Sequence, residues 1–416
     1  MKLNLFRLFI PLILMLAIDI YFFQAVKTLM SGSSPISRKI VIIGFWAITT
    51  LAITLLLSAS FTNWHEWPKF IKTYVFGVIV ILYLSKIVSL PFLAMDDLIR
   101  LGKYVFSKGS TTNDAQSTAG LPISRSQFLM GTALVAAAIP FGTLVYGIIN
   151  GPYHFVVRKK KLVFKNLPMA FNGIKIIQLS DIHTGSWESP AHMQKAVDLI
   201  NKQGADMVLF TGDLVNNLSE EAYPFIPVLK QIKAPLGVYS SLGNHDYGDY
   251  SQWESEADKS KNMEAMYQIH RDLGWKLLRN ENILIRRDNE SIALAGCENW
   301  GASLRFTKYG DINKTLKGID APFTILMSHD PSHWEAQILS HPHHVDLTLA
   351  GHTHGMQFGA DFKSFRWSPA QWFYKQWADL YQKNDKYIYV NRGLGFIGYP
   401  GRVGVKAEIA VFELSC

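Results

Sequence analysis

Four long apolar stretches within the first 150 residues constrain this chain more than any other feature. They lie at Leu5–Val26, Ile40–Ser60, Tyr74–Leu93 and Phe128–Ile149. Each approaches or exceeds the roughly 20 residues with which a helix crosses a hydrocarbon core about 30 Å thick. More spans follow the first stretch and no small-residue cleavage site stands out, so a cleaved signal peptide fits poorly. We therefore predict a transmembrane helical region of about four spans at residues 1–150.

Two charged residues, Asp19 and Lys86, lie inside the predicted spans. A charge in lipid is costly unless it faces other helices or reaches the membrane surface. The two side chains could form a functional pair. Alternatively, Lys86 could extend to the interface from near the end of its span. The sequence leaves both alternatives open.

Composition limits the remaining classes of protein. A chain of 416 residues exceeds one compact core and predicts two or three units. Its two cysteines, Cys297 and Cys416, exclude a disulfide scaffold, so any metal ion must be held by His, Asp and Asn. The excess of Lys and Arg over Asp and Glu is 41 − 33 = 8, which suits anionic membranes or phosphates. No nucleic-acid recognition motif accompanies it, and we expect no nucleic-acid partner.

The sequence indicates only weakly on which side of the membrane the C-terminal part lies. With four spans, the N-terminus and the C-terminal part share a side. Lys and Arg number seven in the loops of one side and eight in those of the other. If the basic run Arg158–Lys161 belongs to a folded strand, the second number falls from eight to four. Because positively charged loops stay in the cytoplasm, the C-terminal part would then lie outside it.

From about Tyr153 short apolar runs alternate with amphipathic stretches, a pattern that predicts an α/β domain at residues 153–416. Buried strands are predicted at Lys175–Leu179, Met207–Phe210, Gly237–Ser240, Phe323–Met327, Val345–Leu349 and Tyr387–Val390. Helices are predicted at Pro190–Gln203 and Pro331–Ser340, and hairpin or edge strands at Asn282–Ala295 and Gly404–Leu414.

Short polar motifs follow five of these buried strands. In chain order they are Ser180-Asp181-Ile182-His183, Thr211-Gly212-Asp213, Gly243-Asn244-His245-Asp246, Ser328-His329-Asp330 and Gly351-His352-Thr353-His354. Because loops at the carboxyl ends of strands form the site of an open α/β sheet, we expect these side chains to meet. A lone His is more often structural, but recurrence at one topological position favours a site. Such ligands suit Mn²⁺, Fe or Zn²⁺.

The ordered blocks D-x-H, G-D, G-N-H-D, a lone H and G-H-x-H resemble the calcineurin-like metallophosphoesterase superfamily over about residues 170–414. The later run Asn391-Arg392-Gly393-Leu394-Gly395, together with the membrane region, looks like the YkuE/YaeI-type membrane-associated phosphoesterases. The resemblance implies a four-layer α/β/β/α sandwich. It also implies two divalent or trivalent metal ions at one sheet edge, with the choice among Mn, Fe and Zn open.

The resemblance also implies a role for each residue. One metal ion would be held by Asp181, His183, Asp213 and His354, and the second by Asp213, Asn244, His329 and His352. His245 would protonate the leaving oxygen or stabilise charge at phosphorus. Asp246 would orient His245, with a simple turn carboxylate as the alternative. Arg392 is a weaker candidate for contact with the substrate phosphate, with a structural role in its loop as the alternative.

An aromatic segment at residues 362–381 is the main clue to the substrate. Interspersed with Lys and Arg, it contains Trp367, Trp372, Phe373, Tyr374 and Trp377. Trp and Tyr favour the membrane–water interface, so the segment could meet the bilayer and admit a lipid-linked phosphoester. The alternative is an insert that packs over the sheet.

These observations favour a membrane-anchored dinuclear-metal phosphoesterase. It would hydrolyse phosphodiester or related phosphate bonds with a water that the two ions acidify. A second interpretation is a UDP-2,3-diacylglucosamine pyrophosphatase of lipid A synthesis, which requires a cytoplasmic catalytic face. A third is a non-catalytic metal-binding membrane scaffold, against which the complete ligand set and His245 argue.

Overall fold

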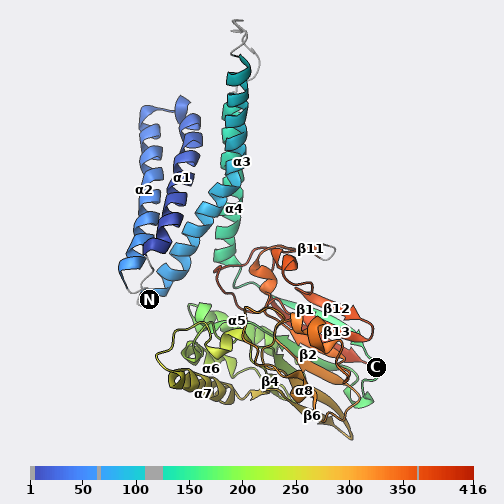
Figure 1. Ribbon diagram of the computed structural model, residues 1–416. Coiled ribbons are helices and arrows are strands. Elements are labelled where there is room, and N and C mark those ends of the chain that lie inside the picture. Colours follow the sequence, from blue (N-terminus) through green and yellow to red (C-terminus); the bar gives the residue numbers. More distant parts are fainter. Residues whose placement is uncertain (1–4, 63–66, 108–124, 363–364) are drawn as a thin grey trace. The chain divides into compact units, whose positions relative to one another are not determined.

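The computed structural model describes residues 5–62, 67–107, 125–362 and 365–416. The chain divides into two compact units, Met1–Tyr146 and Gly147–Cys416. Figure 1 shows that long helices build the first unit and that sheets flanked by helices build the second. Each unit is described by itself below.

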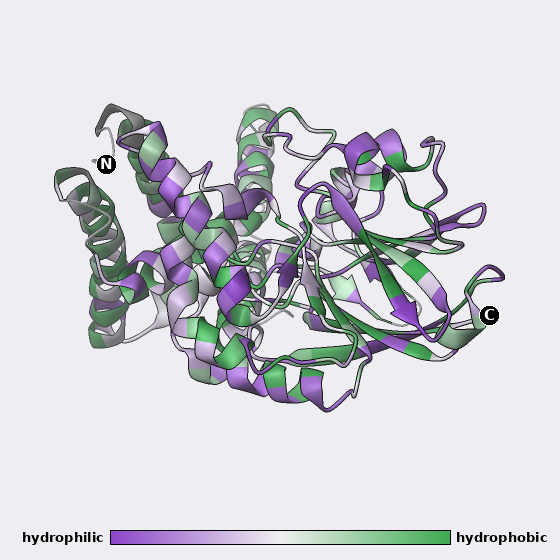
Figure 2. Ribbon diagram, turned by 90° about the horizontal axis from the view of Figure 1, so that it is seen from below, coloured by the Kyte–Doolittle hydropathy of each residue, from purple (hydrophilic) through white to green (hydrophobic). Residues whose placement is uncertain are grey.

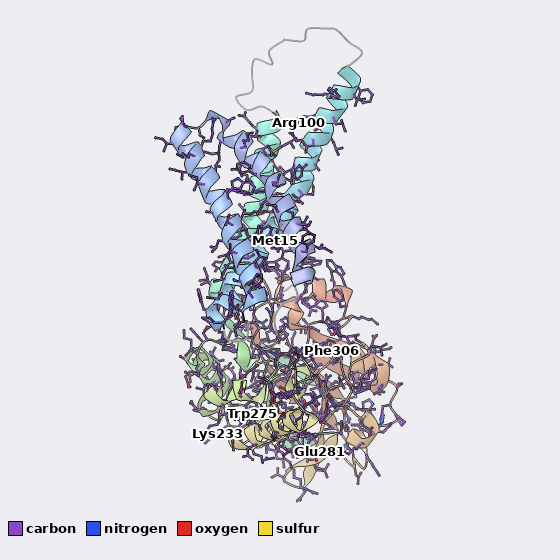
Figure 3. The ribbon with its side chains drawn as sticks, turned by 60° about the vertical axis from the view of Figure 1, so that its left-hand side comes forward. Met15, Arg100, Lys233, Trp275, Glu281 and Phe306 are labelled. Carbon is purple, nitrogen blue, oxygen red and sulfur yellow. The ribbon has the colours of Figure 1, made fainter. Side chains whose placement is uncertain are left out.

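The membrane unit consists of long apolar helices. They are α1 (Leu5–Leu29), α2 (Pro35–Phe61), α3 (Phe76–Ser107, preceded by a π-helical turn at Ile71–Val75) and α4 (Arg125–Asn150). All four are long and apolar enough to cross a membrane, which confirms the predicted spans. In Figure 2 the helices nearest the N-terminus are largely coloured as hydrophobic. Figure 3 labels Met15 on α1 and Arg100 on α3.

Asp19 and Lys86 form an ion pair in the interior of this helical unit. Both residues are buried, at 0% and 5% exposure. The Asp19 carboxylate also accepts hydrogen bonds from the Tyr83 hydroxyl at 2.6 Å and the Thr49 hydroxyl at 2.7 Å. The Lys86 ammonium lies 4.9 Å from the centroid of the Phe45 ring, a cation–π distance. Of the two alternatives, the structure supports the pair rather than extension of Lys86 to the surface.

Two six-stranded sheets form the centre of the second unit. The first has the order β1-β14-β2-β3-β4-β5 and the second the order β12-β13-β9-β8-β7-β6. The first comprises β1 (Phe155–Val163), β14 (Ala407–Ser415), β2 (Ile174–Leu179), β3 (Met207–Phe210), β4 (Val238–Ser240) and β5 (Lys276–Leu277). The second comprises β12 (Asp379–Lys383), β13 (Lys386–Val390), β9 (Leu347–Ala350), β8 (Thr324–Met327), β7 (Glu290–Gly296) and β6 (Glu281–Arg287). A small ribbon pairs β10 (Ala360–Asp361) with β11 (Arg366–Trp367).

Apolar side chains on both faces of each sheet produce four layers. Between the sheets, Ile176 and Leu209 of the first pack in one core with Leu294 and Ile325 of the second. The opposite face of the first sheet packs against α5 (Pro190–Asn201), α6 (Ile226–Leu229) and α7 (Glu256–Leu273). The outer face of the second packs against α8 (Ile312–Leu316) and a π-helical turn at Trp334–Ile338. The expected α/β/β/α sandwich is therefore confirmed.

The six predicted buried strands are present, and the hairpin expected at Asn282–Ala295 forms from β6 and β7. Two expectations need correction. The helix expected at Pro331–Ser340 is mainly the π-helical turn Trp334–Ile338. The run Gly404–Leu414 is not an edge strand, because β14 pairs with β1 on one side and β2 on the other. The basic run Arg158–Lys161 lies within β1.

Lys86→Met should destabilise the membrane unit, because it leaves the Asp19 carboxylate buried without its cation. Breaking a buried pair typically costs about 3–5 kcal/mol, whereas replacing both partners with apolar residues can be neutral. We therefore expect the double variant Asp19→Leu/Lys86→Met to unfold at a higher temperature than Lys86→Met in detergent. Thermal unfolding followed by circular dichroism checks this order. A double variant less stable than Lys86→Met would contradict it.

Candidate metal centre

Five loops bring the sequence-predicted ligands together. Those after β2, β3 and β4 leave the first sheet, and those after β8 and β9 leave the second. Two groups of side chains result, each with ligand atoms that all lie within 4.8 Å of one another. Each group could hold a metal ion. They are Asp181, His183 and His354, and Asp213, His329 and His352.

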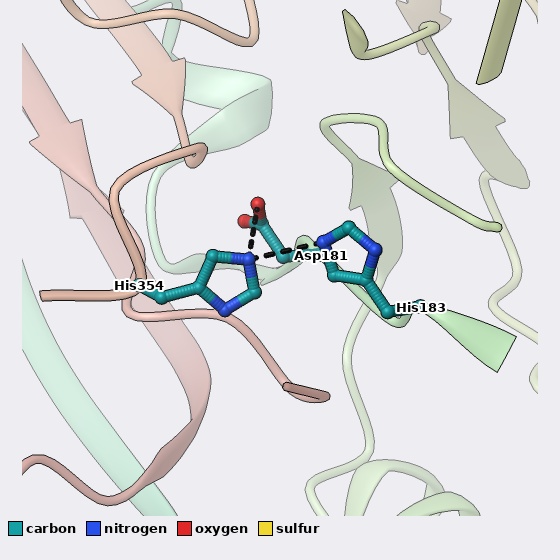
Figure 4. Close-up of side chains that lie close together, drawn as sticks. All are labelled: Asp181, His183 and His354. Carbon is teal, nitrogen blue, oxygen red and sulfur yellow. Dashed lines mark hydrogen bonds and ion pairs between the residues drawn. The ribbon is translucent and has the colours of Figure 1, made fainter. Parts of the chain in front are cut away.

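Figure 4 shows the first group. The His354 Nε2 atom lies 3.2 Å from Asp181 Oδ1 and 3.0 Å from His183 Nε2. His183 directs its Nδ1 to the carbonyl of Val215 at 3.1 Å. An Nδ1–H donated there leaves the lone pair of Nε2 facing the group, as in metal-ligating histidines. Facing nitrogens at this separation repel unless a proton or cation lies between them, so the donor set fits an ion.

The second group repeats this design. His329 directs its Nδ1 to the carbonyl of Thr211 at 2.8 Å, which leaves Nε2 for a metal ion. The Nδ1 atom of His352 lies 3.3 Å from His329 Nε2 and 2.7 Å from Asn244 Oδ1. Asn244 thus joins the group with a neutral oxygen, as the resemblance implied.

Asp213 lies between the two groups. Its Oδ2 atom is 3.1 Å from His329 Nε2 and 3.6 Å from His183 Nε2. Its Oδ1 atom accepts the backbone N–H of His245 at 2.9 Å, which fixes the carboxylate. A carboxylate that faces both groups can bridge two cations, and its charge offsets part of theirs.

Burial and neighbouring charges make this a site that attracts positive charge. Burial raises the pKa of Asp181, but His354 and His329 together lower it further, so the net pKa lies below its usual value. Burial likewise raises the pKa of Asp213, but His329, His245 and His183 together outweigh it, so the net pKa lies well below normal. Burial lowers the pKa of His183 to about 3, so this ligand is neutral at pH 7. Burial lowers the pKa of His329, but Asp213 and Asp181 raise it to about 10, which shows how strongly the two carboxylates favour positive charge at this position.

Ligand residues adopt left-handed backbone conformations that are uncommon outside glycine. Asp181, His183, Asp213, His352 and His354 have φ values of 52°, 50°, 60°, 71° and 50°. Such conformations cost free energy and persist where the surrounding structure enforces them, which is typical of functional sites. The turns redirect each loop as it leaves its strand. Gly351 fits one such turn, since a Cβ there would lie 2.3 Å from Asp181 Oδ2.

His245 lies beside the first group without belonging to it. Its ring centroid is 5.0 Å from that of His183, in an edge-on arrangement. Its Nδ1 contacts the carbonyl of Asn216 at 2.6 Å, so the hydrogen of Nδ1 is committed to the backbone. Any proton that His245 exchanges with a substrate is therefore carried on Nε2.

The contacts of Asp246 match the second alternative, a turn carboxylate, more than a partner of His245. Its carboxylate accepts the backbone N–H groups of Gly243, Asp213 and Leu214 at 2.9, 2.9 and 2.7 Å. Burial and the nearby Asp213 charge raise the pKa of Asp246 to about 7. The carboxylate thus holds the Asp213 loop, while the backbone carbonyl of Asn216 contacts His245.

Arg392 is not brought to the metal groups. It is fully buried, and its guanidinium forms ion pairs with Glu408 at 2.8 Å and Asp361 at 2.9 Å. A different cation, Arg305, lies near the second group. Its guanidinium is 5.7 Å from the Phe306 ring, which contacts His352 edge-on at 5.0 Å between centroids. Figure 3 labels Phe306 in this unit.

Aromatic residues outside the sequence motifs also contact the candidate ligands. The Tyr250 hydroxyl accepts a hydrogen bond from Asn244 at 2.8 Å, and its ring lies 4.6 Å from that of His245. The Tyr374 hydroxyl lies 2.7 Å from His352 Nε2. The Asp330 carboxylate also lies close, with Oδ2 3.6 Å from the same nitrogen. No spacing pattern marks these contacts; only their nearness in sequence to a motif or to the aromatic segment hinted at them.

Strands of both sheets deliver two carboxylates and four imidazoles to this candidate metal site, and the comparisons identify the class of protein. Residues 174–356, which include every proposed ligand, match the calcineurin-like phosphoesterase family. Residues 6–152 match a domain described as a probable calcineurin-like phosphoesterase, transmembrane domain. The chain therefore belongs to the calcineurin-like phosphoesterase family and is a metallophosphoesterase with a membrane domain.

Several relatives align with more than half of this chain. A Danio rerio protein named transmembrane protein with metallophosphoesterase domain is 30% identical over 380 residues, 88% of this chain and 79% of that protein. The uncharacterized metallophosphoesterase YkuE of Bacillus subtilis is 30% identical over 299 residues, 70% of this chain and 98% of that protein. A Bos taurus protein, also named transmembrane protein with metallophosphoesterase domain, is 30% identical over 279 residues, 64% of this chain and 58% of that protein.

Substitution of the ligands should lower the metal content in a pattern set by the geometry. Asp213→Ala should lose both ions because its carboxylate faces both groups, whereas His329→Ala should keep about one ion per chain, since the first group stays intact. Elemental mass spectrometry of purified protein measures the stoichiometry. His341→Ala, which removes a histidine outside the groups, should match the wild type. An Asp213→Ala protein that retained two ions would contradict the bridging role.

Proposed function

We propose that this protein hydrolyses phosphodiester or related phosphate bonds of lipid-linked substrates at a dinuclear metal centre. The observation that carries the proposal is the convergence of the two ligand groups on Asp213, with His245 beside them. A merely structural site has no use for a second ion or for an adjacent imidazole that is not a ligand.

When bound, the two ions supply positive charge that acidifies water and offsets charge on the phosphoryl oxygens. The side chains supply the remaining functions. Asp213 would hold both ions, and Asn244 would add an oxygen without adding negative charge, which would keep the pocket attractive to a phosphate. His245 holds a proton at Nε2 for the leaving oxygen or stabilises charge at phosphorus. Asp246 keeps the Asp213 loop in place through backbone N–H groups.

The aromatic segment supports a lipid-linked substrate. Its described residues, which exclude 363 and 364, divide into a buried anchor and an exposed part. Trp377 is 6% exposed and packs with Ala370 and Ala378. Trp372 and Phe373, by contrast, are 69% and 70% exposed. Large aromatic side chains left in water beside a site commonly mark a contact surface, and in a chain with four membrane spans the bilayer is the natural partner.

A cavity of about 360 Å³ adjoins this exposed part. It is lined by Ala302, Ser332, Glu335, Ala336, Phe373, Tyr374, Lys375 and Gln376. Tyr374 belongs both to this wall and to the surroundings of His352. We infer that one substituent of a phosphodiester would extend from the metal centre into this cavity, which supports diesters over free monoesters as substrates.

The charges of the loops between the membrane spans argue against the interpretation as a UDP-2,3-diacylglucosamine pyrophosphatase. Because the run Arg158–Lys161 is part of strand β1, it carries less weight in the count of membrane loops. The remaining loops favour a catalytic unit outside the cytoplasm, where a nucleotide-linked substrate is not made. The scaffold reading is disfavoured because every ligand position and His245 are retained.

His245→Ala should leave the metal content unchanged and lower turnover of a phosphodiester about 10²–10⁴-fold, the usual contribution of a general acid. Dialkyl and bis(4-nitrophenyl) phosphates separate its two candidate roles. A larger loss on the dialkyl ester, whose leaving group needs a proton, indicates general acid catalysis; equal losses indicate stabilisation of charge at phosphorus. His341→Ala serves as the control. Full activity of His245→Ala on both substrates would remove this residue from the mechanism.

Trp372→Ala should lower hydrolysis of phosphatidylglycerol in vesicles at least about tenfold, because it removes apolar area that enters the bilayer. Hydrolysis of soluble bis(4-nitrophenyl) phosphate should change by less than about twofold, since Trp372 belongs to neither ligand group and does not line the cavity. Tyr223→Ala, which removes another exposed aromatic ring, should affect neither assay. Equal losses on both substrates would contradict a role in lipid access.

A further inference from the structure

The aromatic segment is bonded to the loop that carries His352 and His354. The Thr353 hydroxyl donates a hydrogen bond to the carbonyl of Trp377 at 2.6 Å. The Ser368 hydroxyl donates to the carbonyl of Gly355 at 2.7 Å. The Trp377 ring covers Gly355 so closely that a Cβ there would lie 3.2 Å from it. The segment therefore supports this ligand loop in addition to exposing aromatic rings.

Tyr374 also contacts the imidazole ring of the candidate ligand His352. Its hydroxyl lies 2.7 Å from His352 Nε2, and the two rings meet edge-on at 5.4 Å between centroids. The other nitrogen of His352, Nδ1, faces Asn244 and His329. In a neutral imidazole one nitrogen carries the hydrogen and the other the lone pair. The partner of Nε2 therefore decides whether Nδ1 is free to bind an ion.

Tyr374 differs from the partners of two other ligand histidines. His183 and His329 each direct Nδ1 to a backbone carbonyl of a neighbouring loop, a partner that no side-chain substitution removes. Asp330 also faces His352 Nε2, but at 3.6 Å, beyond hydrogen-bond distance. Its Oδ1 atom already accepts the backbone N–H and the hydroxyl of Ser332. The hydroxyl of Tyr374 is thus the group in hydrogen-bond contact with this nitrogen.

We propose that Tyr374 is a positioning residue for the second metal ion. Its phenol oxygen accepts Nε2–H of His352, which places the lone pair on Nδ1 and fixes the ring toward Asn244 and His329. The inference rests on the proposed dinuclear function and deepens it, because it assigns the aromatic segment a part in building the centre. Partners of this kind typically contribute 10–100-fold to metal affinity.

The test is a titration of metal-free, full-length protein in detergent with Co²⁺, followed by calorimetry and visible absorption. Tyr374→Phe keeps the ring and removes only the hydroxyl. We expect its binding of the second equivalent to weaken about 10–100-fold while the first equivalent binds as in the wild type. His352→Ala identifies which equivalent belongs to the second group. Tyr387→Phe, a hydroxyl deletion in β13 at the core between the sheets, should bind both equivalents normally.

Retention of the first equivalent shows that Tyr374→Phe is folded. Wild-type affinity for both equivalents, or equal weakening of both, would overturn the proposal. Since no substrate is involved, the outcome is separable from that of the proposed function. A wild-type protein that binds two ions and hydrolyses no phosphodiester would refute that function without affecting the role of Tyr374.

Discussion

Two carboxylates buried where the sheets deliver their loops are the constraint on which the rest of the structure depends. Asp181 and Asp213 are 0% and 1% exposed, and ionised carboxylates in such surroundings are costly unless positive charge and hydrogen bonds accompany them. Imidazoles from both sheets supply part of this compensation, and backbone N–H groups supply more, such as that of His352 to Asp181 at 3.0 Å. The remaining deficit of positive charge is what gives the site its affinity for cations.

The amino-acid sequence predicted which side chains the structure brings together, because each follows a buried strand whose apolar run is easy to recognise. Asp181, His183 and Asp213 come after β2 and β3, and His352 and His354 after β9. Strands end where their apolar runs end, and parallel neighbours end at the same edge of a sheet. The local pattern therefore contained most of the information on the site. The four membrane helices were predicted for a similar reason, since length and hydropathy alone specify them.

Other features depend on contacts that no local pattern encodes. Asp246 binds backbone N–H groups that become available only after the Asp213 loop has turned, so its partner could not be read from the motif. Tyr374 reaches His352 from an aromatic segment whose rings are otherwise split between solvent and core. The place of β14 between β1 and β2 is a matter of strand order, which hydropathy does not specify. In each case the missing information is tertiary.

Strand β9 is held on both flanks, with Leu349 paired to Met327 of β8 and to Tyr389 of β13. Side chains of a strand alternate between its faces, so sliding by a single position would invert the whole set. The orientation of the His352 and His354 imidazoles, which follow β9, therefore depends on the register of the sheet. Loops around the pocket can therefore change during evolution, and with them the ester that is bound, while the sheet keeps the candidate metal ligands in alignment.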